Sequence, residues 1–186
     1  MSNISSNLNG LDLKDHAYIN SLLEVLEANL SFVPSSTSKK EVADISLYDP
    51  VITDGGIVGY ITEVGLTSCK VTTILSPDIT LGALDNRTND AGVVTGSLTL
   101  AQNGLCRFAN LSRSCSVAVG DYVVTSGEGI FPEGLLVGSV QNIGIDEYNT
   151  SIYAEIKPFA DVSEIRSVMV ITSFEGQGGI TVSNGE

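Results

Sequence analysis

The chain contains short runs in which apolar and polar residues alternate, and this pattern predicts β-strands. From Leu26 to Phe32 the apolar side chains fall at every second position, which is the period of a strand with one buried face. Turn-forming Asn, Asp and Gly residues separate this run from further strand candidates at 41–47, 59–64, 69–75, 83–87, 91–100, 105–111, 122–125, 135–140, 151–156 and 168–174. A total of about ten to twelve short strands predicts an all-β barrel or sandwich protein.

The two ends of the chain lack this alternation. Residues 1–23 are predicted to be a tail followed by a short helix over 11–23, whose loose apolar stripe suits the end of a coiled coil. Residues 163–166 form at most one helical turn. The Gly- and Ser-rich residues 175–186 are predicted to be a disordered tail.

The stretch 119–140 combines two predicted strands with pronounced turn signals. The segment Ser126-Gly127-Glu128-Gly129 interrupts the first strand, because glycine reaches the positive φ that sharp reversals need. The segment Phe131-Pro132-Glu133-Gly134 fits a type I turn, with Pro second and Gly fourth. We predict that Gly127, Gly134 and Gly138 are backbone requirements, at turns or where a neighbouring strand passes closely.

A similar pattern occurs earlier in the chain. Residues 49–55 and 121–127 share D-x-V-[IV]-T-x-G, and residues 58–65 and 137–144 share V-G-x-[IV]-x-x-[IV]-G. Two motifs in the same order predict a duplicated β unit. We therefore expect two small, similar β-barrel subdomains of about six strands each, over residues 24–80 and 81–174. The last strand, 168–174, belongs to the second subdomain by position, but its return to the first stays open.

Composition narrows the choice of partners. With 22 acidic and 9 basic residues the net charge is −13, which repels phosphate and anionic lipid and disfavours nucleic acid as a partner. No apolar run reaches about 18 residues and the start of the chain is polar, so neither a membrane span nor a signal peptide is expected here. Cys69, Cys106 and Cys115 lack a C-x-x-C spacing, which favours buried free thiols and leaves a pairing of Cys106 with Cys115 open.

The residues give little support to catalysis or metal binding. His16 is the only histidine, and a Ser-His-Asp triad with Ser126 would require it to fold back onto the β region. We expect Ser126 to cap its own turn instead. The acidic residues lack an EF-hand spacing and the glycine turn lacks a following helix and lysine, so neither a metal nor a cofactor is predicted. These observations predict a binding or scaffolding module rather than an enzyme.

The glycines and apolar residues of 119–140 follow the series G-D-x-V-x-T-S-G-x-x-x-x-[FI]-P-x-G-x-x-V-G-x-V. The matching residues are Gly120, Asp121, Val123, Thr125, Ser126, Gly127, Pro132, Gly134, Val137, Gly138 and Val140. This series resembles the signature of the MreC family, the bacterial rod shape-determining proteins. Residues 50–61, including Gly56 and Gly59, resemble the family's P-V-[IV]-x-x-x-G-[LI]-V-G-x-[IV] element. Residues 91–96 and 11–14 resemble two further family segments, so the resemblance covers about residues 11–174.

The chain departs from the family pattern in two places. The run that precedes the first P-V element is shortened to Ile45–Tyr48, so we expect the first barrel to be smaller or irregular. The family's N-terminal membrane helix and most of its coiled coil are missing. The resemblance therefore implies the extracytoplasmic region of a single-pass protein of the bacterial cytoplasmic membrane.

The resemblance implies a non-enzymatic scaffold of the cell-elongation complex, which makes peptidoglycan and maintains cell shape. The implied partners are the elongation transpeptidase and glycosyltransferase, MreD, and MreB through a cytoplasmic part, together with self-association as a dimer or filament. Two other classes stay open. One is a trypsin-like β-barrel hydrolase, active or degenerate, and the other is a barrel that binds a small ligand in an apolar pocket.

Ile130 and Phe131 lie between glycines in the predicted 126–135 loop. An aromatic side chain at a loop tip is a natural anchor for a partner protein. Phe131 could equally fold back as a plug over the open end of its barrel. Both interpretations follow from the sequence, and burial distinguishes them.

Overall fold

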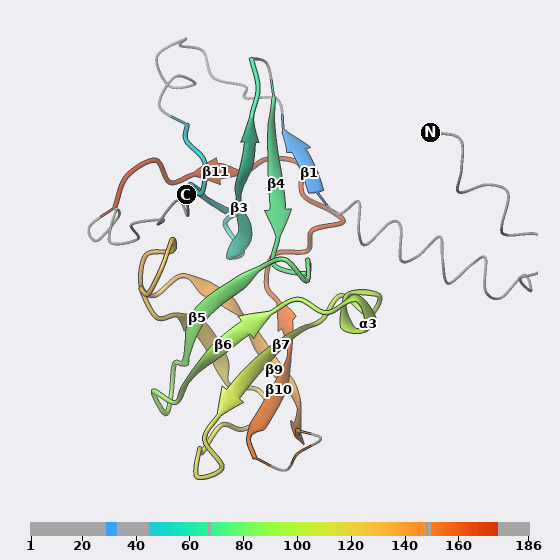
Figure 1. Cartoon of the computed structure of the whole chain (residues 1–186), viewed down its shortest axis with the longest axis vertical. Helices are drawn as coiled ribbons and strands as arrows, with labels where there is room; N and C mark the ends of the chain where they lie inside the picture. The colour runs from blue at the N-terminus through green and yellow to red at the C-terminus, as the bar shows by residue number, and fades with distance from the viewer. Residues whose placement is uncertain (1–28, 33–44, 67, 147, 149, 175–186) are drawn as a thin grey trace, which may run out of the picture.

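The structure is a computed structural model that describes residues 45–66, 68–146, 148 and 150–174, and the backbone of 29–32. The predicted helix over 11–23, both predicted tails and residues 41–44 lie outside this part. The described part is nearly all β-structure (Figure 1), which confirms the predicted class. Its elements are β1 (Asn29–Phe32), β2 (Pro50–Ile52), β3 (Ile57–Val64), β4 (Cys69–Thr73), β5 (Thr80–Asp85), β6 (Ala91–Thr95), α3 (Leu98–Ala101), β7 (Cys106–Leu111), β8 (Tyr122–Thr125), β9 (Leu136–Ile145), β10 (Ile152–Pro158) and β11 (Met169–Val170).

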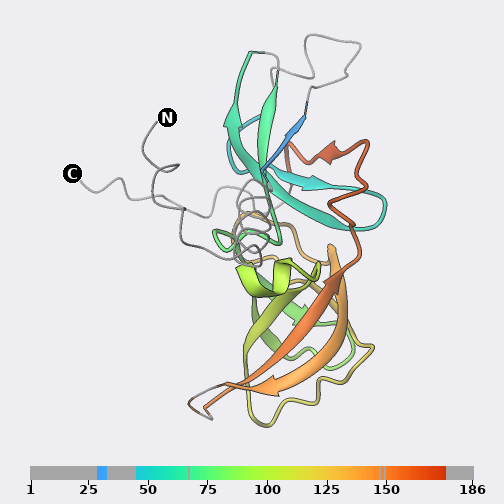
Figure 2. The ribbon, with the colours of Figure 1, turned by 90° about the vertical axis from the view of Figure 1, so that its right-hand side faces the viewer.

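A closed barrel forms from β10-β7-β6-β5-β8-β9, with antiparallel pairing throughout. Alternate side chains point into it, as in β5, where Leu81, Ala83 and Asp85 are buried. The largest fully buried side chains in its core cluster include Phe108, Phe131, Leu111 and Ile156. Closure leaves this barrel without an exposed edge strand. It forms the lower half of the molecule in Figure 2.

Strands β1 to β4 and the last strand, β11, form a five-stranded sheet in the order β1-β4-β3-β2-β11. In the described residues, the first of the two expected barrels is therefore a five-stranded sheet rather than a barrel of about six strands, as the smaller or irregular first barrel expected from the shortened run before β2 allows. The physical reason lies in its outer strands, because β2 has 3 residues and β11 has 2. Strands this short supply too few hydrogen bonds to wrap a sheet around a core. Val51, Val58, Ile61, Cys69, Val71 and Ala160 form its small buried cluster.

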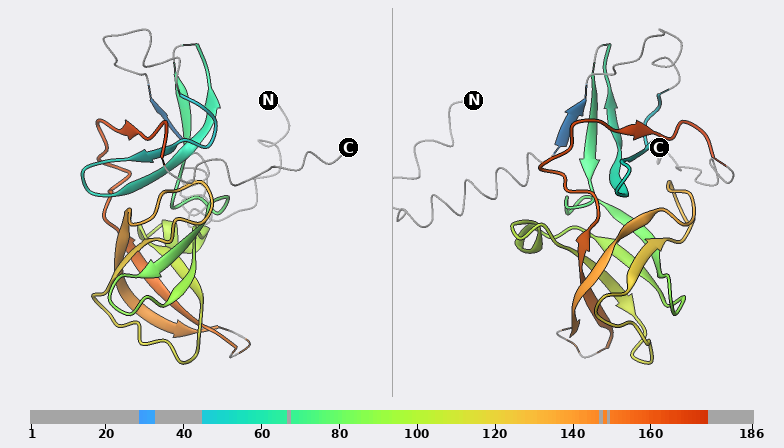
Figure 3. Two further views of the ribbon diagram at one scale, coloured as in Figure 1. Left: turned by 90° about the vertical axis from the view of Figure 1, so that its left-hand side faces the viewer. Right: turned by 180° about the vertical axis from the view of Figure 1, so that it is seen from behind.

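The last strand pairs with the first half of the chain. Met169 and Val170 of β11 pair with Ile52 and Val51 of β2, so the chain leaves the barrel after β10 and crosses back to the sheet. The right panel of Figure 3 shows this return path. The last strand therefore returns to the first subdomain, which the sequence had left open. The chain passes between the sheet and the barrel twice, from β4 to β5 and from β10 to β11.

The repeated sequence motif corresponds to a repeated structure, here named the first unit (β2, β3 and β4) and the second unit (β8, β9 and β10). Val51 pairs with Gly59 in the first unit, and Val123 pairs with Gly138 at the equivalent place in the second. A bulge follows each of these pairs, between Val51 and Ile52 and between Val123 and Val124. The outer pairs also match, because β3–β4 and β9–β10 each shift register two residues beyond the paired glycine.

The turn that enters each unit is also repeated. The carboxylates of Asp49 and Asp121 each accept a hydrogen bond from the backbone N–H three residues earlier, at 2.7 Å and 2.7 Å. The residue between the turn and the aspartate has positive φ in both, +70° at Tyr48 and +92° at Gly120. Tyrosine rarely adopts this conformation. The shared aspartate thus holds the turn, while the residue before it is free to differ.

Two strand predictions need correction. The candidate 91–100 ends as β6 at Thr95, and the next residues form α3. Directly after β6 the backbone of Gly96 lies against the carbonyl oxygens of Leu75 and Ser76, an approach that leaves no space for a Cβ atom. Of the 41–47 candidate, the described residues 45–47 lie in the non-strand segment that enters β2.

The sheet and the barrel share apolar contacts. Ile57 at the start of β3 and Ile74 just after β4 are fully buried, and both belong to the core cluster of the barrel. The sheet therefore contributes two side chains to the core of the barrel. The described part of the molecule has one principal core in the barrel and a satellite core in the sheet.

Candidate functional site

The residues of the 119–140 motif lie along β8, β9 and the loop between them. The glycines singled out in this motif and in the related residues 50–61 fall into two groups. Positive φ occurs at Gly56, Gly120, Gly127 and Gly134. At Gly59 and Gly138 a Cβ atom would instead overlap the backbone carbonyl oxygens of Thr72 and Lys157 on the next strand. Each of these positions therefore requires glycine, either because φ is positive or because a neighbouring backbone leaves no space for a Cβ atom.

Thr125 organises the 126–135 loop from inside. Its hydroxyl is fully buried, donates to the carbonyl oxygen of Pro132 at 2.5 Å and accepts from the N–H of Leu135 at 2.9 Å. The N–H of Gly134 donates to the Thr125 carbonyl at 3.0 Å. A buried hydroxyl with both a donor and an acceptor partner stabilises the loop without a desolvation penalty. The Thr, Pro and Gly of the motif are therefore parts of one loop closure.

Ser126 has a turn role. Its hydroxyl oxygen accepts a hydrogen bond from the N–H of Glu128 at 3.3 Å, and its own N–H donates to the carbonyl of Gly82 at 3.0 Å. A serine nucleophile would instead face a general base. His16 lies outside the described residues. The contacts of Ser126 match the capping role expected for it.

Phe131 lies inside the protein and not on its surface. Its side chain is 1% exposed and belongs to the barrel core, while Ile130 is half-buried against the same core. The Phe131 ring meets Tyr60 of β3 in an edge-to-face arrangement, with centroids 6.3 Å apart. The interpretation of Phe131 as an exposed anchor is therefore corrected, because the side chain plugs the barrel end that faces the sheet.

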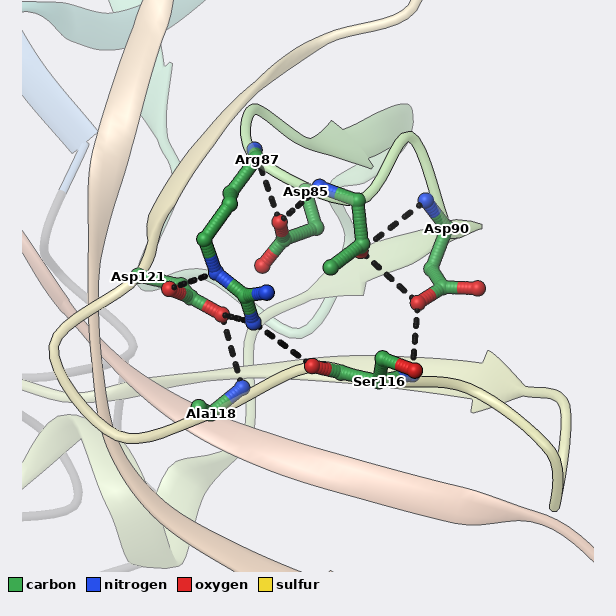
Figure 4. A network of polar contacts seen from close by, with 7 residues as sticks. Asp85, Arg87, Asp90, Ser116, Ala118 and Asp121 are labelled. Atoms are coloured by element: carbon green, nitrogen blue, oxygen red, sulfur yellow. Dashed lines mark hydrogen bonds and ion pairs between the residues drawn. The ribbon is translucent and has the colours of Figure 1, made fainter.

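A polar network joins the turn after β5 to the segment that enters β8 (Figure 4). Arg87 donates to both carboxylate oxygens of Asp121, from Nε at 2.8 Å and from a terminal nitrogen at 2.6 Å. The same terminal nitrogen donates to the carbonyl of Ser116 at 2.6 Å. The hydrogen bond from Arg87 lowers the pKa of Asp121 to about 2, with a further contribution from the Ala118 N–H. Two-point contact of this kind fixes geometry as well as charge.

The aspartates around this ion pair hold backbone turns. Asp85 is fully buried and one of its oxygens accepts from the N–H groups of Arg87 and Thr88, at 2.9 and 2.8 Å. Asp90 accepts from the Thr88 hydroxyl at 2.7 Å and from the Ser116 N–H at 2.8 Å. The network thus ties the β5–β6 turn to the segment that enters β8. Sequence reasoning missed Arg87, because it lies 34 residues from its partner and outside any local motif.

The remaining reactive groups have structural surroundings. Cys106 is fully buried, and burial raises the pKa of its thiol to about 12, which makes it a poor nucleophile at neutral pH. Cys69 is also a buried free thiol, while Cys115 is half-buried. In the described part of the chain no group of three or more His, Cys, Asp or Glu residues could hold a metal ion. No helix in that part is long and apolar enough to cross a membrane.

Comparisons with known proteins point to one family. Residues 38–172 match the family model described as rod shape-determining protein MreC, barrel core. The cell shape-determining protein MreC of Listeria monocytogenes is 29% identical over 125 residues, which cover 65% of this chain and 42% of that protein. This chain thus spans less than half the length of that relative.

Solved structures share the fold. A crystal structure of MreC from Pseudomonas aeruginosa has a TM-score of 0.64 and 20% identity, and the match covers 70% of this chain and 83% of that one. In a complex between the penicillin-binding protein PBP2 and MreC from Helicobacter pylori, the matching chain has a TM-score of 0.52 and 18% identity, with 68% and 83% of the two chains covered. At these identities the likeness concerns the fold.

Proposed function

Because the chain belongs to the MreC family of rod shape-determining proteins, we propose that it is an extracytoplasmic scaffold of the machinery that builds the elongating cell wall. The observation that carries this proposal is the family match across residues 38–172, which spans the open sheet and the barrel together. A scaffold acts by holding other proteins in place, so its function resides in surfaces.

The first proposed partner is the transpeptidase of cell elongation. The support is a structure in which a penicillin-binding protein is in complex with MreC from Helicobacter pylori. The elongation glycosyltransferase, MreD, and MreB through a cytoplasmic part are further proposed partners. Self-association as a dimer or filament is proposed on the same family grounds. These proposals are taken from relatives that this chain covers only in part, with 42% of the Listeria protein matched.

The proposed scaffold has no catalytic role of its own. In support, the Ser126 hydroxyl serves its own turn, and Asp121 is engaged by Arg87. Both residues belong to the family motif and both hold backbone. A hydrolase would need Ser126 free to attack a substrate. We also propose anchoring in the cytoplasmic membrane by a segment outside this chain.

Binding to the transpeptidase tests the scaffold proposal directly. The chain is immobilised, and the soluble extracytoplasmic domain of the transpeptidase from the same organism is titrated by biolayer interferometry. Saturable binding is expected, and its absence would contradict the proposed partnership. A fluorophosphonate probe tests the hydrolase alternative in parallel. Labelling that disappears in Ser126→Ala would establish a reactive serine and refute the non-enzymatic scaffold.

A further inference from the structure

Three exposed large apolar side chains of the second unit lie at the start of β8, at the start of β9 and just after β10. Tyr122 is 53% exposed, Leu136 is 42% exposed and Phe159 is 36% exposed. The rings of Tyr122 and Phe159 meet edge to face, with centroids 5.2 Å apart and an interplanar angle of 86°. Leu136 pairs with Val124, two residues along β8 from Tyr122. We call these three side chains the outer face of the second unit.

The duplication shows what such a face does within this protein. The equivalent positions in the first unit are Pro50, Ile57 and Ile74, which follow from the shared D-x-V and V-G motifs and from matching hydrogen bonds. In particular, Ile74 donates to the Val58 carbonyl at 2.8 Å, and Phe159 donates to the Val137 carbonyl at 3.1 Å. All three residues of the first unit are buried. Ile57 and Ile74 pack into the barrel core.

One element that packs against the first unit is a loop that carries an aromatic side chain. Phe131, from the 126–135 loop, lies edge-on against Tyr60 of the first unit. At the position of Tyr60 the second unit has Ser139, whose small side chain leaves room above the strand. Ser139 lies between the two ends of the face, paired with Tyr122 on one side and Lys157 on the other. The same kind of surface is therefore buried in the first unit and partly exposed in the second, where the backbone of Gly55 and Gly56 lies against Phe159 and Leu136.

The charge around the outer face of the second unit indicates which kind of partner it binds. The chain has a net charge of −13, and the exposed acids Asp54 and Asp161 border the face. The backbone of Gly55, next to Asp54, comes close to the Phe159 carbonyl. Hydrogen bonds from Ser163 lower the pKa of Asp161, with a smaller contribution from the charge of Lys157, so Asp161 stays ionised beside one basic neighbour. A second copy would bring another −13 to the contact, whereas a basic partner is attracted.

We propose that the outer face of the second unit docks a different protein, through an aromatic or large aliphatic side chain presented by a loop and flanked by Lys or Arg. This inference rests on the proposed scaffold function, and it names the surface and the chemistry of the partner. The Tyr122 and Phe159 rings form the centre of the contact, as buried aromatics do in other interfaces. The acids around them form the charged rim.

The test measures binding of the same transpeptidase domain to variants of this face. Tyr122→Ser, Leu136→Ser and Phe159→Ser should each weaken binding by at least about tenfold, the effect of removing a central anchor. Matched controls are Tyr148→Ser and Leu66→Ser, which remove side chains that are 83% and 100% exposed at other places. These controls should bind within about twofold of the wild-type chain. Raising the salt concentration should weaken the wild-type interaction, because it screens the charged rim.

A second pair of variants keeps the test valid if a ring substitution harms the fold. The Ser139 hydroxyl accepts a hydrogen bond from the Gln141 side chain at 3.0 Å, and Ser139 belongs to neither core cluster, so a longer residue there removes no core packing. Ser139→Lys and Ser139→Glu add similar bulk to the face but opposite charge. Ser139→Lys should weaken binding more than Ser139→Glu if the partner is basic. The reverse order would overturn the assigned charge of the partner.

The remaining outcomes separate the inference from the function on which it rests. If the wild-type chain does not bind the transpeptidase domain, the proposed partnership fails and the inference fails with it. If the wild-type chain binds and the face variants bind equally well, only the inference is overturned. If analytical ultracentrifugation shows a dimer that Phe159→Ser dissociates, the occupant is a second copy, which also overturns the inference.

Discussion

Removing the aromatic plug of the barrel should cause a large loss of stability. The Phe131 side chain is 1% exposed and packs in the core cluster of the barrel. Phe131→Ala should therefore lower the free energy of unfolding by about 3–5 kcal/mol, the range for a buried phenylalanine. For a protein of this size, each 1 kcal/mol corresponds to roughly 2–4 °C, so the melting temperature should fall by roughly 6–20 °C.

Part of this energy should depend on Tyr60, because its ring meets Phe131 edge to face. A double-mutant cycle with Phe131→Leu and Tyr60→Leu isolates that contact, and it should give a coupling energy of about 0.5–1.5 kcal/mol. Urea denaturation followed by circular dichroism measures each variant. Tyr148→Ala is the control, since that side chain is 83% exposed and its removal should change stability by less than about 0.5 kcal/mol. A loss below about 1 kcal/mol for Phe131→Ala would refute the plug.

Three further predictions concern the glycine, ionic and thiol features. Gly138→Ala should destabilise the protein in urea denaturation by about 1–3 kcal/mol, because the new Cβ meets the backbone of Lys157; unchanged stability would contradict the close approach. The pKa of Asp121 is lowered to about 2 from an ordinary value of 3.8, so its stabilising contribution is present above about pH 4 and is lost as the pH falls toward 2. Asp121→Asn should flatten this part of the pH–stability curve, and an identical curve would show that Asp121 does not contribute. Ellman's reagent should modify half-buried Cys115 in the native protein long before Cys106, and mass spectrometry that finds Cys106 modified first would oppose the assigned burial.

Turns, strands and the duplicated unit could be predicted from short stretches of the sequence. The turns at Gly127 and Gly134 follow from sequence because only a few residue types reach positive φ, and both glycines have it. The hairpin formed by β3 and β4 was also visible, since two alternating runs flank a short polar turn. The duplicated unit was predictable for the same reason, because each copy carries its own turn and strand signals. Such signals depend on a few consecutive positions.

The candidate site was only partly predictable. The Thr125 and Pro132 positions were identified through the motif, but the hydrogen bond between them appears only in the folded loop. Arg87 was not identified at all, because nothing in its neighbours indicates that it meets Asp121. Likewise the strand predicted over 91–100 was wrong beyond Thr95, since apolar alternation continues where no neighbouring strand is available.

The sequence by itself determined the all-β class, the order of the strands, the duplication and the turn glycines, because these depend on local backbone preferences and on a period of two. Only the tertiary structure decided that Phe131 is buried, that β11 returns to β2, and that β5 to β10 close into a barrel while β1 to β4 and β11 form a five-stranded sheet. Each of these outcomes depends on which distant segments meet. Contacts between segments that lie tens of residues apart depend on which apolar surfaces of the whole chain are buried together. They cannot be predicted from a short stretch of sequence.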